Sequence, residues 1–166
     1  MRRVLVLAAF ALLAGVGTAQ VDPFAFMPDG GRGLMARAFP TPEAQAEALA
    51  ATRSAEEWLG ALTASDLSER ERATLAAYLS RVAPSDYVQS LPPDGRDLAL
   101  VQCQSCHSLF SGYLMQRRDR NGWLVIFASP FHKDIPMSQT EREIFADYSA
   151  INMPMRVEDV PPELRF

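Results

Sequence analysis

The chain of 166 residues has twenty acidic and sixteen basic residues, and its formal net charge of −4 argues against nucleic acid and anionic membrane surfaces as partners. Such a balance suits a partner with a basic docking surface, and plain solubility explains it equally well. The length is sufficient for one domain or for two very small ones.

Residues 1–19 predict a signal peptide. Arg2 and Arg3 form a short basic region, residues 4–17 are an unbroken apolar stretch, and residues 17–19 offer small side chains at a cleavage site. The apolar stretch is shorter than the about 20 residues of a membrane-spanning helix. We therefore expect an exported periplasmic protein with no stable membrane insertion after signal cleavage.

The next segment, residues 20–40, is rich in proline and glycine and has no sustained hydrophobic period. It predicts an irregular leader. Phe24, Phe26 and Met27 form its apolar cluster. We expect this cluster to lie as a strap over the protein's own core.

Residues 41–90 predict a helical unit. Thr41 has the side chain of an N-cap, and Ser54 and Ser68 each begin a capping box with a glutamate three residues later. The helix after Ser68 has apolar positions with the period of 3.6 residues, and Pro84 ends it.

Residues 91–155 predict a second helical unit, so the expected fold class is all-α. A short helix begins at Gly95, and a third capping box at Ser138 opens a helix with one apolar face that extends to Ile151. Residues 156–166 are rich in proline and predict an extended tail.

A C-x-x-C-H motif follows the Gly95 helix and consists of Cys103, Cys106 and His107. At this spacing each thiol can add to a vinyl group of one haem, and the adjacent imidazole becomes an axial ligand of the iron. The motif therefore predicts one covalently bound haem c per chain.

Three other interpretations of the motif are less favoured. A thioredoxin-like redox pair would follow a strand in a βαβ pattern, whereas a helix is predicted here. A structural zinc site needs four ligands. Only His132 remains to complete the set, and His107 directly beside Cys106 fits the usual ligand spacings poorly. A structural disulfide across two residues would restrict the unfolded chain very little.

The two helical units share a pattern of tryptophan, capping serine and tyrosine. Its members are Trp58, Ser68 and Tyr78 in the first unit and Trp123, Ser138 and Tyr148 in the second. The second copy has five additional residues between the tryptophan and the cap. The pattern indicates either a degenerate internal repeat, of which only the second copy has the haem motif, or two unrelated amphipathic helices with similar caps.

With these features, the stretch from Gly95 to Ile151 resembles a class I cytochrome c. The resemblance implies that a helix containing Gly95 crosses a helix containing Tyr148, with haem beneath the crossing. The compact layout looks most like the small monohaem cytochrome subunits of periplasmic dehydrogenases such as the sulfite-oxidising type.

The sequence departs from that family after the haem histidine, because no proline follows His107 shortly to accept from its outer ring nitrogen. The second axial ligand is also open. Met137 is the first candidate and His132 the second, and Met137 could instead be a hydrophobic staple. The remaining alternatives are Met115, Met153, Met155 or an empty site.

A basic stretch after the motif contains Arg117, Arg118 and Arg120. Guanidinium groups match carboxylates well, so these side chains are candidates for pairing with haem propionates. An exposed face explains most of them equally.

The predicted function is that of a one-electron carrier rather than an enzyme, with a redox protein or a dehydrogenase subunit as its partner. One alternative is a haem sensor or small haem enzyme with an open iron site. Another is a docking subunit of a dehydrogenase complex that uses residues 20–90 as its interaction module.

Overall fold

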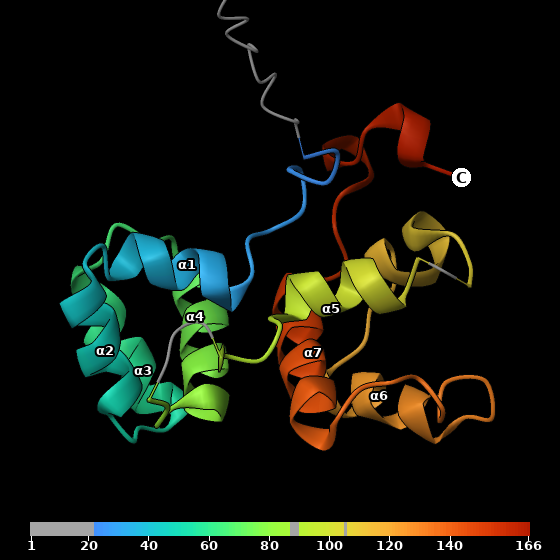
Figure 1. Ribbon diagram of the computed structural model, residues 1–166. Helices are drawn as coiled ribbons and strands as arrows, with labels where there is room; N and C mark the ends of the chain where they lie inside the picture. Colours follow the sequence, from blue (N-terminus) through green and yellow to red (C-terminus); the bar gives the residue numbers. More distant parts are fainter. Residues whose placement is uncertain (1–21, 87–89, 105) are drawn as a thin grey trace, which may run out of the picture.

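The computed structural model describes residues 22–86, 90–104 and 106–166 (Figure 1). The predicted signal peptide, residues 1–19, lies outside the described residues. The described part of the chain consists of helices and loops without a strand, which confirms the all-α fold class. No helix in these three ranges has the length and apolar character needed to cross a membrane.

Two helical units lie side by side in Figure 1. The first contains α1 (Gly31–Ala38), α2 (Pro42–Ala50), α3 (Ala55–Ala61), the 3₁₀ turn η1 (Leu62–Ala64) and α4 (Glu69–Val82). The second contains α5 (Gly95–Gln102), the π-helical turn η3 (Phe110–Leu114), α6 (Arg120–Val125), the 3₁₀ turn η4 (Ile126–Ala128) and α7 (Gln139–Asn152). Helices α4 and α7 pack against each other and join the units.

The three predicted capping boxes are confirmed. Ser54, Ser68 and Ser138 each accept a hydrogen bond from the backbone three residues later, at 3.2–3.3 Å. The glutamates at those positions accept from the serine N–H groups at 2.7–2.8 Å. These boxes begin α3, α4 and α7, so hydrogen bonds between residues close in the sequence determine where these three helices start.

The prediction of irregular backbone over residues 20–40 is wrong for α1. Gly30 and Gly31 favour a loop locally, but a Cβ atom at Gly31 would overlap the Tyr78 ring. Glycine is therefore required for the close approach of α1 to α4. Leu34 and Met35 of α1 are buried, so tertiary packing stabilises a helix that local propensity disfavours.

The predicted crossing of the Gly95 and Tyr148 helices is confirmed. A Cβ atom at Gly95 would overlap the Cβ and ring of Tyr148, and α5 packs on α7. The same glycine–tyrosine contact thus occurs once in each unit. The correspondence between the units extends from sequence to packing.

The two tyrosines also link the units reciprocally. The Tyr78 hydroxyl donates to the carbonyl oxygen of Pro92, just before α5, at 2.7 Å. The Tyr148 hydroxyl donates to the carbonyl oxygen of Pro28, just before α1, at the same distance. Each tyrosine therefore packs within its own unit and anchors the segment that leads into the other.

Asp94 caps two helices at once where the N-terminal ends of α1 and α5 meet. Its Oδ1 accepts from the backbone N–H groups of Arg96 and Asp97 at 3.0 and 3.1 Å, and its Oδ2 accepts from that of Arg32 at 3.0 Å. A Cβ atom at Gly30 would overlap this carboxylate. One carboxylate therefore serves both helix starts.

Asp94→Ala should destabilise the protein by roughly 1–4 kcal/mol, because a lost N-cap costs about 0.5–2 kcal/mol and two helices lose theirs. Asp94→Asn should have an intermediate stability, since its single amide oxygen can accept at only one helix start and its NH2 group faces the N–H donors of the other. Urea denaturation of the three proteins measures the difference. Equal stability of the alanine variant and the wild type would contradict the shared-cap role.

The buried Asp94 carboxyl should also make the stability of the protein depend on pH. Burial raises the pKa of the Asp94 carboxyl, which is 4% exposed, against the opposing effect of its amide donors. The folded chain then binds this proton more tightly than the unfolded chain. Stability should fall as pH rises from the unfolded pKa of about 3.9 through the folded pKa, and Asp94→Asn should lack this contribution.

The prediction of an extended tail over residues 156–166 is wrong. Two 3₁₀ turns form there, η5 (Val157–Asp159) and η6 (Pro162–Leu164), and Val160 between them is buried. The Arg165 Nε donates to the Val160 carbonyl at 2.8 Å. Burial of an apolar side chain therefore folds the tail back on the protein.

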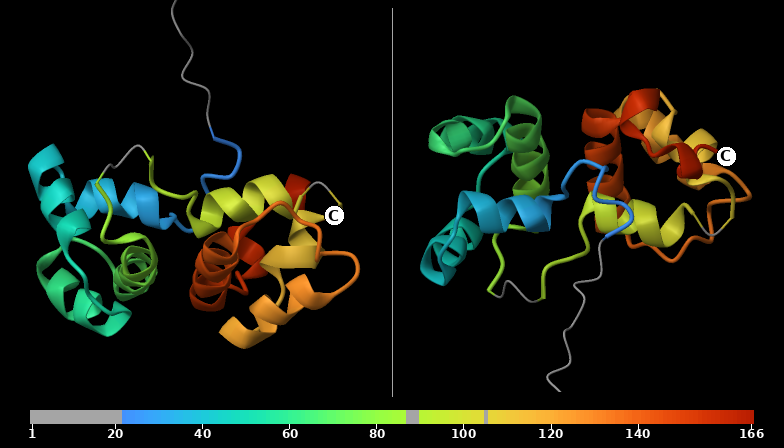
Figure 2. Two further views of the ribbon diagram at one scale, coloured as in Figure 1. Left: turned by 60° about the horizontal axis from the view of Figure 1, so that its bottom comes forward. Right: turned by 90° about the horizontal axis from the view of Figure 1, so that it is seen from above.

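The strap prediction is confirmed for the N-terminal apolar cluster. Met27 is buried, and Phe24 and Phe26 pack against the core. Figures 1 and 2 show this segment, in blue, near the red tail, and Phe24, Phe26 and Leu164 line one hollow. Strap and tail together cover the second unit.

The two units differ in the segment between the helix that contains the glycine (α1 or α5) and the helix that contains the tryptophan (α3 or α6). In the first unit this interval contains α2, whose Ala48 and Leu49 are buried in the core. In the second unit it contains the C-x-x-C-H segment and the π-helical turn. The second unit encloses a cavity next to that segment.

Candidate functional site

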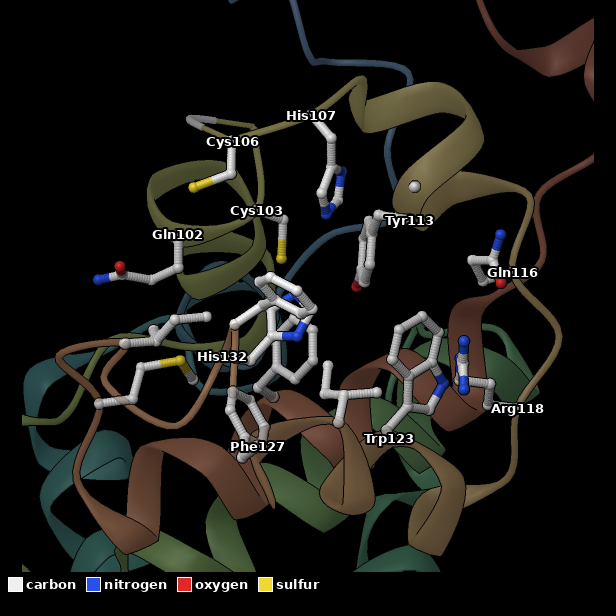
Figure 3. Close-up of a pocket in the computed structure, with 16 residues that line it drawn as sticks. Gln102, Cys103, Cys106, His107, Tyr113, Gln116, Arg118, Trp123, Phe127 and His132 are labelled. Atoms are coloured by element: carbon white, nitrogen blue, oxygen red, sulfur yellow. The ribbon is translucent and has the colours of Figure 1, made fainter. Parts of the chain in front are cut away.

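A cavity of about 610 Å³ lies in the second unit between the C-x-x-C-H segment and the residues of α6, η4 and α7 (Figure 3). Cavities for cofactor-sized ligands span about 300–1,000 Å³. All the leading site residues predicted from sequence line it, namely Cys103, Cys106, His107, His132 and Met137. The fold therefore brings these residues together.

Helix α5 positions the first cysteine. Cys103 directly follows the helix, and its N–H donates to the Ala99 carbonyl at 3.0 Å. Burial, aided by the neighbouring Cys106 thiol, raises the pKa of the Cys103 thiol to about 12. Cys103 is thus a protonated thiol at neutral pH, which is unlike the thiolate that a thioredoxin-type redox pair requires.

His107 extends into the cavity between Cys103 and Tyr113 (Figure 3). Its Nδ1 lies 3.3 Å from the Ser108 carbonyl oxygen, which accepts a hydrogen bond from the ring N–H group. A Cβ atom at Gly112 in the π-helical turn would overlap the ring, so this turn packs directly on the imidazole. The Ser108 carbonyl oxygen thus accepts the hydrogen bond for which the sequence offers no proline carbonyl.

His132 lies on the other side of the cavity. The centroids of the His107 and His132 rings are 6.4 Å apart, with an angle of 75° between their planes. The His132 Nδ1 is 2.9 Å from the Ser129 hydroxyl. Both histidines therefore have Nδ1 engaged by an oxygen atom.

Arg142 of α7 fixes the loop that contains His132. Its guanidinium donates to the carbonyl oxygens of Lys133, Ile135 and Met137 at 3.0–3.3 Å. Met137 at the end of the loop is buried. The loop is thus restrained along its length by one side chain.

Aromatic side chains form the inner wall of the cavity. Tyr113, Trp123, Phe127 and Phe145 pack with ring centroids 5.3–5.7 Å apart. The Tyr113 hydroxyl pairs with the Ser149 hydroxyl at 2.9 Å. The shared pattern of the two units drew attention to Trp123 in the sequence, but Tyr113 and Phe127 were missed, because they follow no periodic pattern.

One cationic side chain at the cavity, Arg118, suits a ligand with carboxylates. The Trp123 Nε1 is buried without a hydrogen-bond partner, as is that of Trp58 in the first unit, and Trp123 borders the cavity. The Arg118 guanidinium lies over the Trp123 ring, 5.7 Å from its centroid, and also lines the cavity. Because the Trp123 Nε1 atom has almost no accessible surface and the equivalent Trp58 shares this feature, the orphaned N–H belongs to the packing common to both units and does not indicate a ligand.

Arg117 and Arg120, the other two arginines of the basic stretch, do not line the cavity. Arg120 was a candidate for propionate pairing, but its Nε is 2.6 Å from Asp147, so an internal ion pair engages it. Arg117 is exposed. Of the three arginines, Arg118 alone is among the residues that line the cavity.

The remaining candidates for the second axial ligand, Met115, Met153 and Met155, are not among the residues that line the cavity. Tyr148 lies at the helix crossing instead of at the cavity wall. Over the three described ranges, no three His, Cys, Asp or Glu side chains converge as a site for a bare metal ion.

Comparison with known proteins gives no match to a family model, to a curated protein or to a solved structure.

Proposed function

We propose that the chain is an exported periplasmic one-electron carrier with one covalent haem c, and that it exchanges electrons with an oxidoreductase partner. Cys103 and Cys106 would form the thioethers and His107 would be an axial ligand. The observation that carries the proposal is that all three motif residues line one cofactor-sized cavity whose remaining wall is largely aromatic. The α5–α7 crossing adds support, because a class I cytochrome c has the same arrangement.

The residues present fit a haem in both chemistry and position. Both thiols border the cavity, with Cys106 exposed and Cys103 partly buried, and the aromatic wall would exclude water from one face of a planar ligand. Arg118 offers a donor for a propionate group. When bound, the haem supplies a reversible one-electron change at iron.

The protein would hold the cofactor with side chains whose orientation is already fixed. Ser108 and Gly112 fix the orientation of the His107 ring. A hydrogen bond to the outer ring nitrogen keeps the proton on Nδ1 and leaves Nε2 available to the metal. Such a framework suits electron transfer, since a change of redox state requires little rearrangement.

The mouth of the cavity offers a surface for a partner. Cys106 and His107 are exposed, and the Phe131 ring at the same cavity is 90% exposed. These exposed residues would be the part of the protein surface nearest to the bound cofactor. An electron would leave through this face.

Redox titration of the protein, exported from cells that attach haem c, tests the proposal. We expect a single optical transition that involves one electron per chain, and a reduced form that does not bind carbon monoxide readily, because side chains of the protein would hold the iron from both sides. Rapid binding of carbon monoxide would instead support a sensor or enzyme with an open iron site. Protein without haem would refute the proposal.

A further inference from the structure

The relative position of the two histidine rings matches a pair of axial ligands. A metal ion bound to one nitrogen of each imidazole, at about 2 Å, separates the ring centroids by roughly 6 Å. The observed separation of the His107 and His132 centroids is 6.4 Å. We propose that His132 is the second axial ligand, so that the haem iron has bis-histidine ligation, and that Ser129 positions it; this inference rests on the proposed function.

The hydrogen bonds of the two rings have the same pattern. The Ser108 carbonyl accepts from the His107 Nδ1, and the Ser129 hydroxyl, which can also act as an acceptor, lies 2.9 Å from the His132 Nδ1. A proton held on Nδ1 leaves the Nε2 lone pair for the metal and makes the imidazole a better donor. Ser129 is therefore a positioning residue that acts through His132.

The burial of Met137 has an explanation that does not involve a metal. In the first unit, Leu67 occupies the equivalent position just before the capping serine, and it is 5% exposed, compared with 7% for Met137. Arg72 donates to the Leu67 carbonyl at 2.8 Å, as Arg142 does to that of Met137 at 3.1 Å. A residue in the unit without the haem motif packs in the same way, so Met137 fits a staple.

His132, in contrast, lies in a segment that the first unit lacks. The second unit has five additional residues between its tryptophan and its capping serine, and His132 is in that interval. Arg142 holds the same segment through the Lys133 and Ile135 carbonyls. The unit with C-x-x-C-H thus has an added, restrained loop that carries an imidazole to the cavity.

The ligand determines the redox behaviour. Methionine opposite histidine raises the reduction potential of a haem, whereas imidazole favours the oxidised form. With His132 as ligand, we expect a lower midpoint potential than that of the His132→Met variant.

Spectroscopy of the haem-loaded variants tests the inference. The oxidised wild type should be low-spin and should lack the weak long-wavelength band of methionine ligation. His132→Ala should become high-spin, bind carbon monoxide readily when reduced, and return to low-spin on addition of imidazole. His132→Met should raise the midpoint potential.

Met137→Leu is the matched control, because leucine occupies the equivalent place in the first unit. It should leave the low-spin spectrum and the midpoint potential unchanged. Ser129→Ala should shift the midpoint potential, and Ser129→Thr, which keeps the hydroxyl, should restore it. A methionine band in the wild type that Met137→Leu abolishes would overturn the inference but not the proposed function. A high-spin wild type would overturn the inference and would also favour a sensor or enzyme with an open iron site over an electron carrier. Absence of covalent haem would defeat the proposed function itself.

Discussion

Replacement of both Cys103 and Cys106 by alanine should abolish covalent haem attachment entirely. The two thiols are the only cysteines of the chain, so no other side chain can form a thioether with haem. Mass spectrometry of the denatured protein, expressed with export and haem attachment, should show one haem in the wild type and the bare polypeptide in the variant. Cys106→Ala alone should retain at most one thioether, with little haem-loaded protein.

Gln104→Ala is a suitable control, since Gln104 is an exposed position inside the motif spacing and has no thiol. It should load haem like the wild type. A wild-type mass that equals the bare polypeptide, under conditions where a known cytochrome c is loaded, would contradict the central proposal. Haem that remains attached to the double alanine variant after denaturation would contradict the assigned attachment sites.

Tyr148→Ala should destabilise the protein by roughly 3–5 kcal/mol, the range for large aromatic residues removed from a core. The Tyr148 side chain is 3% exposed, fills the space that Gly95 leaves and donates to the Pro28 carbonyl. Its removal would open a cavity at the α5–α7 crossing and would release the segment before α1. Equilibrium urea denaturation measures the loss.

Tyr148→Phe separates the two contributions, because phenylalanine keeps the ring and loses only the hydrogen bond. It should cost about 0.5–1.5 kcal/mol. Tyr78→Ala should have an effect similar to that of Tyr148→Ala, since Tyr78 has the equivalent contacts in the first unit. A loss within experimental error for Tyr148→Ala would refute its role in the crossing.

The equivalent contacts also bear on the origin of the two units. The Gly31–Tyr78 and Gly95–Tyr148 contacts, the capping serines and the arginine bonds to Leu67 and Met137 occur in the same order in both. Unrelated helices with similar caps would not be expected to share the glycine contacts as well. These observations favour a degenerate internal repeat, with α2 where the second unit has its haem motif.

Short-range interactions were sufficient to predict part of the molecule. A capping box joins residues three positions apart, so α3, α4 and α7 could be placed from Ser54, Ser68 and Ser138 alone. The C-x-x-C-H motif is equally local, because one short segment supplies both thiols and the imidazole. Hydrophobic periodicity completed the all-α prediction.

Contacts between residues far apart in the chain decided the rest. Helix α1 contains glycines that disfavour a helix locally, and it forms because α4 packs on Gly31. The approach of His132 to His107 depends on Arg142 and on the path of an irregular loop, which no periodic pattern encodes. The dual cap at Asp94 likewise requires two helix ends to meet, because a carboxylate can accept from a second helix only after the tertiary fold has brought it there.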